Sequence, residues 1–200
     1  MPWQNVSNAS VSSESPGAFG TGLFDEPYGT IARSFPRWMV TSNVAMGANA
    51  GVYRQIVLPA GLTAGAMTFL TATTAKLGGS HGWYAVTDQN LNVLAVTADQ
   101  TDAATTWGTA NSPQKLAFTS PLQTSYTGIY YAAISVTAST LPTFGGTVIM
   151  AVAGTQAPPI PYGIFTAALA LPPAVGSVAP SFGAVAGGFG GSFYVNLSVS

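Results

Sequence analysis

Side chains that could do acid–base or nucleophilic chemistry are scarce in this chain. It has one histidine, His81, and no cysteine, which excludes thiolate chemistry, zinc–sulfur sites and any site that needs two imidazoles. Serines are plentiful, but none lies in a GxSxG elbow that would hold it ready for attack. We interpret His81 as a turn residue that leads into a strand. The sequence therefore predicts no catalytic residue and no enzyme.

Metal and cofactor patterns are equally weak. Asp99 and Asp102 lie three residues apart in a polar stretch, where carboxylates and loop carbonyls could ligate Ca²⁺, but the ligand density of an EF-hand loop is missing. Solvated acids or Asx-turn residues are the favoured interpretation, so no metal site is predicted. The glycine runs GGS (78–80) and GGFGG (187–191) lack the strand–loop–helix context of a phosphate cradle, and we expect no cofactor.

A carbohydrate site is the binding function that these residue types allow. Trp107 lies in the long polar stretch Ala98–Gln114, where exposure is expected, and Asp99 and Asp102 lie in the same stretch. Aromatic residues of the expected strands, such as Trp83, are instead assigned to a core or an interface. The candidate glycan contacts are therefore Trp107, Asp99 and Asp102.

The chain carries very little charge. Charged residues make up 6% of it, against about 25% in an ordinary soluble domain. The net charge is −1 and no basic cluster is present, which argues against nucleic acid as a partner. So few charges favour a surface that is covered by neighbouring subunits or coated with Thr, Ser, Asn and Gln.

Neither a membrane span nor a secretory signal is expected. The apolar run Gly163–Leu171 is about half of the ~20 residues that cross a bilayer, and two prolines end it. The first residues, MPWQNVSNASVSSESPG, have neither a basic n-region nor an apolar h-region. We expect synthesis in a cytoplasm without an encoded export route, and no membrane partner.

The stretch Gly82–Thr97 predicts a β-hairpin at the centre of the fold. Two apolar runs flank the turn Asp88-Gln89-Asn90, and alternate residues of the first run, such as Trp83 and Tyr84, are apolar on both faces. A strand that is apolar on both faces belongs inside a covered sheet.

Further strands are expected along the chain at short spacing. They are Val52–Leu58, Ala66–Thr74, Leu116–Thr119, Gly128–Thr137 (the expected partner of the hairpin), Thr147–Ala153 and Phe193–Ser200. Turns are expected at Lys76–Ser80, Pro121–Thr124 and Leu141–Gly146. In the last strand, Phe193, Val195, Leu197 and Val199 should face inward and Tyr194, Asn196, Ser198 and Ser200 outward. About eight short strands without an amphipathic helix indicate an all-β, jelly-roll-like antiparallel β-sandwich with an extended N-terminal arm.

Two irregular blocks flank the strand-rich part. Residues 1–50 form the expected arm, and residues 51–200 the β-sandwich domain, which includes a Gly/Pro-rich segment at 154–191 where proline forbids long helices and central strands. The arm could wrap one end of its own sandwich, or its aromatic residues could anchor it in neighbouring subunits. The candidate assembly anchors are Trp3, Phe19, Phe24, Tyr28, Phe35 and Trp38.

Three runs of the chain resemble a known module. LPAGLTAGAMTFLTATTA, GWYAVTDQNLNVLAVTADQ and KLAFTSPLQTSYTGIYYAAISV are similar to a β-sandwich module of tailed-bacteriophage virion proteins, found in minor tail, tail-fibre and head-fibre components of phages of actinobacteria. The similarity covers roughly Val52–Gly146 and Phe193–Ser200. It brings no catalytic residues, and it implies a role in assembly or surface attachment.

The resemblance implies a non-enzymatic structural protein on the surface of a tailed-phage virion, made in the host cytoplasm. As a capsid decoration or head-fibre protein, it would stabilise or decorate the particle through contacts with copies of itself, expected as trimers, and with other virion proteins. The alternative is a tail or tail-fibre component that binds a host cell-surface glycan through a loop such as Asp99–Trp107. Decoration is preferred because a receptor-binding tip is usually carried on a longer shaft. A secreted carbohydrate-binding module ranks lower because neither a signal sequence nor cysteine is present.

Overall fold

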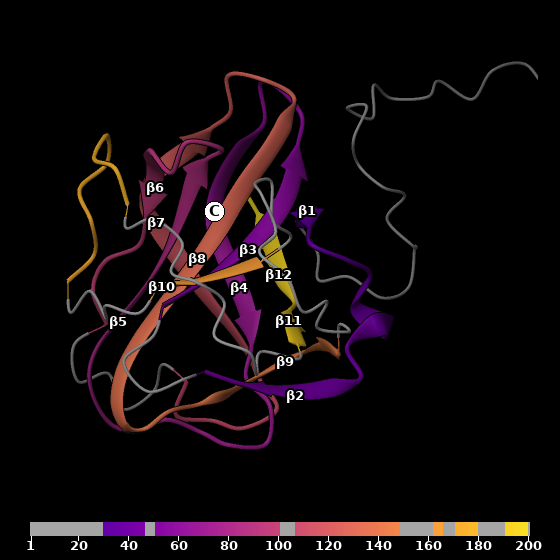
Figure 1. Ribbon diagram of the computed structural model, residues 1–200, viewed down its shortest axis with the longest axis vertical. Helices are drawn as coiled ribbons and strands as arrows, with labels where there is room; N and C mark the ends of the chain where they lie inside the picture. The colour runs from indigo at the N-terminus through magenta and orange to yellow at the C-terminus, as the bar shows by residue number, and fades with distance from the viewer. Residues whose placement is uncertain are drawn as a thin grey trace, which may run out of the picture.

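The computed structural model describes residues 30–46, 51–100, 107–148, 162–165, 171–179 and 191–199, and all that follows concerns these ranges. Within them the chain is β-structure, apart from turns and the three-residue 3-10 helix η1 (Arg37–Met39). Figure 1 shows the long strand β8 (Gly128–Thr140) running across the front of the molecule, with β2 (Ser42–Ala45) and β9 (Thr143–Val148) side by side at the bottom of the view.

The strands form three antiparallel sheets. The four-stranded sheet has the order β1 (Thr30–Arg33), β12 (Val195–Ser198), β4 (Thr63–Leu70), β7 (Pro113–Gln123). The five-stranded sheet has the order β10 (Tyr162–Phe165), β3 (Gly51–Leu58), β8, β5 (Leu77–Asp88), β6 (Val93–Val96). A small sheet joins β11 (Gly191–Phe193), β9 and β2.

Four pairs of strands are nested, so that each pair lies between the two strands of the pair before it in the sequence. β1 pairs with β12, β3 with β8, β4 with β7, and β5 with β6. The ladders β4·β12 and β5·β8 then join these pairs into the two larger sheets. The sheets pack face to face, with Phe69 of β4 lying 4.7 Å from Tyr84 of β5 between ring centroids. The protein is an all-β sandwich, as the sequence predicts.

The predicted hairpin is present as β5 and β6, and β8 is its neighbour in the sheet. The Asp88 side chain closes the turn at Gln89-Asn90. Its Oδ1 accepts the backbone N–H groups of Asn90 (2.8 Å) and Asn92 (2.9 Å), and its Oδ2 accepts the Asn92 side-chain amide (2.7 Å). This Asx turn fixes the register of the hairpin because three donors converge on one carboxylate.

Both faces of β5 are buried, as its residue pattern predicts. Tyr84 and Val86 belong to the core between the two large sheets. Trp83 and Ala85 point to the opposite face, where they pack in a second apolar cluster. The other members of that cluster are Tyr53, Leu91, Val93, Val96, Tyr131, Ala133 and Ala179, with Ile129 packed against it. The five-stranded sheet therefore packs apolar side chains on both of its faces.

The free edge of β6 is covered by the Gly/Pro-rich part of the chain. The Gly176 N–H donates to the Val93 carbonyl (2.8 Å), the Val93 N–H to the Ser177 carbonyl (2.9 Å), and the Ala179 N–H to the Leu91 carbonyl (2.8 Å). We call residues 171–179 the capping segment. It satisfies the backbone groups of an edge strand that would otherwise be open to pairing.

Two of the expected turns lie largely inside strands, and the third is shorter than expected. Gly78 and Gly79 form part of β5, where the ladder shifts register between Gly79 and His81, so this stretch makes a bulge rather than a turn. β7 continues through Pro121, which an edge strand tolerates because its missing N–H leaves no ladder partner unpaired. β9 begins at Thr143, so the connection from β8 is only Leu141-Pro142.

The last strand differs from its predicted one-faced pattern. The predicted strand is interrupted at Tyr194, which lies between β11 and β12. The side chains of Tyr194, Asn196 and Ser198 are buried rather than facing outward. The reason is tertiary. The Asn196 amide donates to the Thr30 hydroxyl (2.6 Å), and Phe35 packs edge-on against Tyr194. β12 has a neighbour on each side and a covered outer face.

Part of the predicted arm belongs to the sheets. Thr30–Arg33 forms β1 and pairs with β12, and Ser42–Ala45 forms β2 and pairs with β9. Strand pairing in the described chain therefore starts before residue 50, where the composition of the sequence changes.

Candidate functional site

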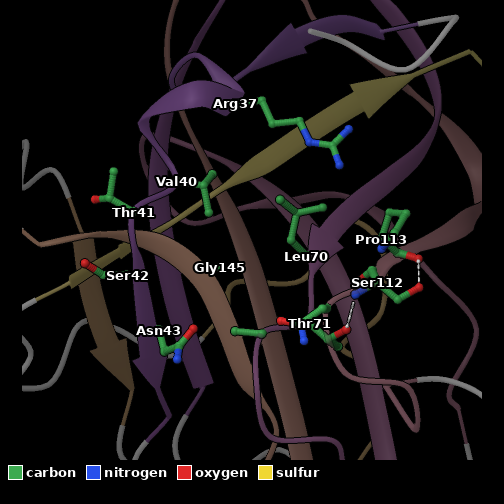
Figure 2. A pocket seen from close by; sticks show the side chains of 12 residues that line it. Arg37, Val40, Thr41, Ser42, Asn43, Leu70, Thr71, Ser112, Pro113 and Gly145 are labelled. Atoms are coloured by element: carbon green, nitrogen blue, oxygen red, sulfur yellow. Dashed lines mark hydrogen bonds between the residues drawn. The ribbon is translucent and has the colours of Figure 1, made fainter.

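A polar pocket of about 460 Å³ lies where η1 and β2 face the β4–β7 edge of the sandwich (Figure 2). It brings together segments from four separate parts of the chain. They are Arg37 with Val40–Asn43, Leu70–Ala72, Asn111–Pro113 and Gly145. Its volume is in the range of about 300–1,000 Å³ that small-ligand sites occupy.

Thr71 builds the base of the pocket. Its N–H donates to the Ser112 carbonyl (2.8 Å), its Oγ1 accepts the Ser112 N–H (3.1 Å), and its hydroxyl lies 2.6 Å from the Thr109 carbonyl oxygen. The Asn111 N–H donates to the Ala72 carbonyl (2.8 Å), and Asn111 has a φ of 53°. Asparagine tolerates this left-handed conformation better than most residues, so the turn before β7 is held in one shape.

Two polar walls stand on this base. Figure 2 shows Thr41, Ser42 and Asn43 on one side and Ser112 with Pro113 on the other. The Asn43 side-chain amide donates to the Thr73 hydroxyl (3.0 Å), which leaves its carbonyl oxygen as an acceptor. Gly145 lies on the floor, where an added Cβ would come within 2.9 Å of Val40 Cγ1 and 3.2 Å of Leu70 Cβ. The floor is therefore flat because β9 carries no side chain there.

One basic side chain lines the pocket. Arg37 is the one charged side chain among the residues that line it. Two further basic residues, Arg33 and Lys115, lie on β1 and β7 of the four-stranded sheet. The acids of the described chain, Asp88 and Asp99, belong to the β5–β6 region of the other sheet. The remaining basic residues of the described chain are Arg54 on β3 and Lys76 just before β5.

The candidate glycan residues do not form the predicted site. Trp107 was expected to be exposed, and that expectation is wrong, because its side chain is fully buried in the sandwich core. Its Nε1–H donates to the Tyr84 hydroxyl (2.6 Å), and the Lys76 ammonium lies 5.4 Å from its ring centroid. Asp102 lies outside the described residues. A buried indole offers no face for a sugar, so Trp107 is a structural residue.

The Asp99 carboxylate lies within hydrogen-bond distance of His81, the only histidine in the sequence. Its Oδ2 lies 2.6 Å from His81 Nδ1, and its Oδ1 accepts the Gly82 N–H (3.1 Å). The Gln100 N–H donates to the Gly82 carbonyl (2.8 Å). The sequence did not identify this partner for His81, because strand β6 and its hairpin turn separate the two residues. These contacts connect Asp99, which follows β6, to His81 and Gly82 in β5.

Phe35, the one anchor candidate whose side chain is described, lies on the sandwich itself. Phe35 packs against Tyr194 with 5.8 Å between ring centroids, and the Arg54 guanidinium lies 5.6 Å from the Phe35 ring centroid. Of the predicted anchors, Trp3, Phe19, Phe24, Tyr28 and the Trp38 side chain lie outside the described residues. For Phe35, the contacts match the alternative in which the arm wraps its own sandwich.

Buried aromatic hydroxyls have strongly shifted acidity. Burial raises the pKa of Tyr53 and of Tyr84 well above the ordinary value for a phenol. Burial also lowers the pKa of Arg54 to about 10. These groups lie in the packed interior and at its margin, away from the pocket, so they bear on stability and not on the site.

Neither a protein-family model nor a curated protein matches this chain. In the described ranges no group of three or more His, Asp or Glu side chains is placed to hold a metal ion. Nor does the described part contain a helix long and apolar enough to span a membrane.

Sequence reasoning missed the pocket. Its lining combines Thr, Ser, Asn and one Arg with Val, Leu, Ala, Pro and Gly, spread over about a hundred positions, and no local motif connects them. A weak signal existed in Asn111-Ser112-Pro113, which is typical of a turn, but a turn alone does not predict a site.

Proposed function

We propose that this protein is a non-enzymatic structural protein on the surface of a tailed-phage virion, in the manner of a capsid decoration or head-fibre protein. The observation that carries the proposal is an apolar strip on a sandwich that is poor in charge. Leu171, Val175 and Val178 of the capping segment are 63%, 52% and 70% exposed. Apolar side chains gathered at one edge of a protein with so few charges favour contact with another subunit.

The strand order supports a scaffold of the kind that virion proteins use. Of the eight strands that pair in this nested way, the first pairs with the last, the second with the seventh, the third with the sixth and the fourth with the fifth. This is the pattern of one long hairpin that folds over into two sheets. β1, β3, β4, β5, β6, β7, β8 and β12 pair in this way. We propose that these eight strands form a jelly roll, with the sheet of β2, β9 and β11 added at one end. Jelly rolls serve in viral capsid proteins and in lectins.

The partners follow from the same features. Copies of this chain and other virion proteins would cover the capping segment, and burial of apolar area would contribute about 25 cal/mol per Å² before the costs of association. Placement on the virion after synthesis in the host cytoplasm is part of this proposal. So is assembly as a trimer.

The test is the position of the protein on the particle and its state in solution. Antibody labelling and electron microscopy of the virion should find it on the head. The purified chain should form oligomers that Val178→Lys weakens, because a charge would be buried in the contact. Val57→Lys is the matched control, since Val57 is 51% exposed on β3. A stable monomer that hydrolyses sugars and is absent from particles would refute the proposal.

Glycan binding remains the second candidate, and the polar pocket is the observation that favours it. Hydroxyl and amide side chains line both of its walls, which is the chemistry that sugar hydroxyls require. In this form, a tail or tail-fibre component would bind a host-surface glycan through the Arg37 pocket instead of the stretch around Trp107. Labelling on the tail rather than the head would favour this candidate.

A further inference from the structure

We infer that the pocket between η1, β2 and the β4–β7 edge binds a neutral sugar that carries an N-acetyl group in preference to the parent hexose. The inference rests on the second candidate function, glycan binding, and adds the class of sugar. It is carried by an apolar centre, an amide oxygen beside that centre and a polar rim. The ligand is neutral because Arg37, the one charged side chain of the lining, already has interactions of its own.

The centre of the pocket is apolar. A Cβ built on Gly145 would lie 2.9 Å from Val40 Cγ1 and 3.2 Å from Leu70 Cβ, so both side chains meet over this glycine. Figure 2 shows them between the two walls, and both are only half-buried, so part of their surface still faces water. A methyl group placed there would remove that apolar area from water. A plain hexose would instead place a hydroxyl against it without a partner.

Asn43 supplies the partner for an amide N–H beside this centre. Its own side-chain amide donates to Thr73 Oγ1 (3.0 Å), which leaves the carbonyl oxygen as an acceptor. An acetamido group carries its N–H and its methyl on either side of one carbonyl carbon. One such group can therefore donate to Asn43 and cover Val40 and Leu70 at the same time. A hydroxyl on the same ring carbon can donate to Asn43 but does not reach the apolar centre.

The rim favours a sugar over a peptide of small residues. Thr41 and Ser42 lie on one side of the pocket, and Asn111 and Ser112 lie on the other. Thr41 and Asn111 are exposed, and neither side chain forms a hydrogen bond within the described residues. Sugar hydroxyls can both donate to and accept from such groups, whereas a peptide has few hydroxyls to offer them. The lining includes no aromatic ring for stacking, so a monosaccharide should bind with a Kd on the order of 1 mM.

The experiment is a titration of the purified full chain, followed by NMR through the amide shifts of the protein. The probes are N-acetylglucosamine and N-acetylgalactosamine, each with its parent hexose, and N-acetylalanine methylamide as a peptide without sugar hydroxyls. At least one N-acetyl sugar should bind about tenfold more tightly than its parent hexose and than the peptide, because it adds a covered methyl group and a bonded amide. Its shifts should fall on β2, on Gly145 and on the turn that precedes β7.

Two variants test the centre of the pocket. Val40→Thr keeps the shape of the side chain but replaces one methyl group by a hydroxyl, so it should weaken the N-acetyl sugar about fourfold and leave the parent hexose unchanged. Asn43→Ala removes the amide oxygen and should weaken the N-acetyl sugar about fivefold. Each variant should retain the far-UV circular dichroism of the parent protein.

A third variant tests the rim, with a matched control. Asn111 has a φ of 53°, so Asn111→Gly keeps the turn and removes only the side-chain amide. It should weaken the N-acetyl sugar and the hexose by the same factor. Asn90→Gly is the control, because Asn90 is an exposed turn asparagine of the β5–β6 hairpin, outside the pocket, and it should change neither affinity.

Several results would overturn the inference. If both N-acetyl sugars bound no more tightly than their parent hexoses, the selection would be refuted while glycan binding would stand. Binding of the peptide as tight as that of the sugars would make the pocket a peptide site. An equal loss with Asn90→Gly and Asn111→Gly would place the binding elsewhere. If no probe bound at all, the pocket would not be a sugar site, whereas the virion proposal, which is tested by labelling, would stand.

Discussion

Substituting Gly82 by alanine tests whether the Trp107 ring is a tightly packed part of the sandwich core. Gly82 lies in β5, directly beneath the Trp107 ring. A Cβ built there would overlap Cζ3 of the indole and lie 2.5 Å from Cη2, with the Ser135 carbonyl oxygen at 3.4 Å. One of the two must move if a methyl group is added.

The ring has little room to retreat. Its Nε1–H is bonded to the Tyr84 hydroxyl at 2.6 Å, its ring centroid lies 5.6 Å from that of Tyr84, and its backbone has a φ of 57°. A tryptophan in the left-handed region is rare, which indicates that packing of the ring outweighs backbone preference. The Lys76 ammonium, 5.4 Å from the ring centroid, packs near it as well.

The expected cost follows from two opposing terms. Overpacking of a tight core costs about 1–3 kcal/mol, and replacing glycine by alanine restricts the unfolded chain by about 0.4–1 kcal/mol in favour of folding. We expect Gly82→Ala to lower the free energy of unfolding by about 1–2 kcal/mol, which is the difference of the two terms. Trp107→Phe alone should cost about as much, because it loses the bond to Tyr84 and leaves a void.

A double-mutant cycle makes the test specific. The pair Gly82→Ala/Trp107→Phe should cost about 1–2 kcal/mol less than the sum of the single variants, because the added methyl occupies space that the smaller ring vacates. Free energies would come from urea unfolding followed by far-UV circular dichroism. Gly61→Ala is the control. It has a φ of 76° and open space around its Cβ, so its cost is backbone strain and should not couple to Trp107.

Two outcomes would refute this account. If Gly82→Ala were neutral and Trp107→Ala cost less than about 0.5 kcal/mol, the indole would be a surface residue, as its polar sequence context suggests. Additive costs in the cycle would mean that the methyl and the ring do not meet. In either case Trp107 would return as a candidate for glycan stacking.

Three further predictions concern pH, the hairpin turn and the arm. Burial raises the pKa of Tyr53 and Tyr84, so their stabilising contribution is complete below the unfolded value of 10.0 and is lost as pH rises above it. The free energy of unfolding should fall by roughly 1.4 kcal/mol per pH unit for each of them, seen as 295 nm absorbance rising together with the loss of β-sheet signal. Burial lowers the pKa of Arg54 to about 10, so the loss of its proton at high pH favours the folded state and offsets part of this fall. Asp88→Ala should lower the free energy of unfolding by about 1–2 kcal/mol in urea unfolding because three N–H groups lose their acceptor, and Asp88→Asn should lose less. Deleting residues 1–29 should leave the circular dichroism and urea midpoint of the sandwich intact but reduce incorporation into particles, whereas deleting residues 1–50 should also lower the midpoint because it removes β1 and β2. Normal incorporation of the shorter deletion would contradict the anchoring role.

Much of the fold could be predicted from local pattern. The hairpin of β5 and β6, its turn at Asp88 and the two apolar faces of β5 follow from alternation and Asx chemistry within sixteen residues. The strands β3 and β8 follow from β-branched and aromatic runs in the same way. Boundaries were weaker where glycine or proline lay inside a strand, because a bulge and a turn use the same residues.

The candidate site was beyond such patterns. Trp107 and Asp99 lie near each other in sequence, yet one enters the core and the other bonds to His81. Polar neighbours predicted exposure for Trp107, but the position of a large ring depends on which cavity the distant strands leave for it. The pocket of Arg37 depends on η1 meeting the β4–β7 edge, and no residue spacing records that contact.

The sequence by itself determined the class of the protein. Period-two runs, turn residues and the lack of amphipathic helices require strands, and the absence of cysteine together with a single histidine restricts the chemistry that any site can perform. Tertiary structure decided what each face meets. It buried Asn196 against Thr30, covered the edge of β6 with the capping segment, and gathered polar side chains from three segments around Arg37. The physical reason is that alternation reports which side chains share a face, whereas burial and charge depend on what packs against that face, and this partner can lie anywhere in the chain.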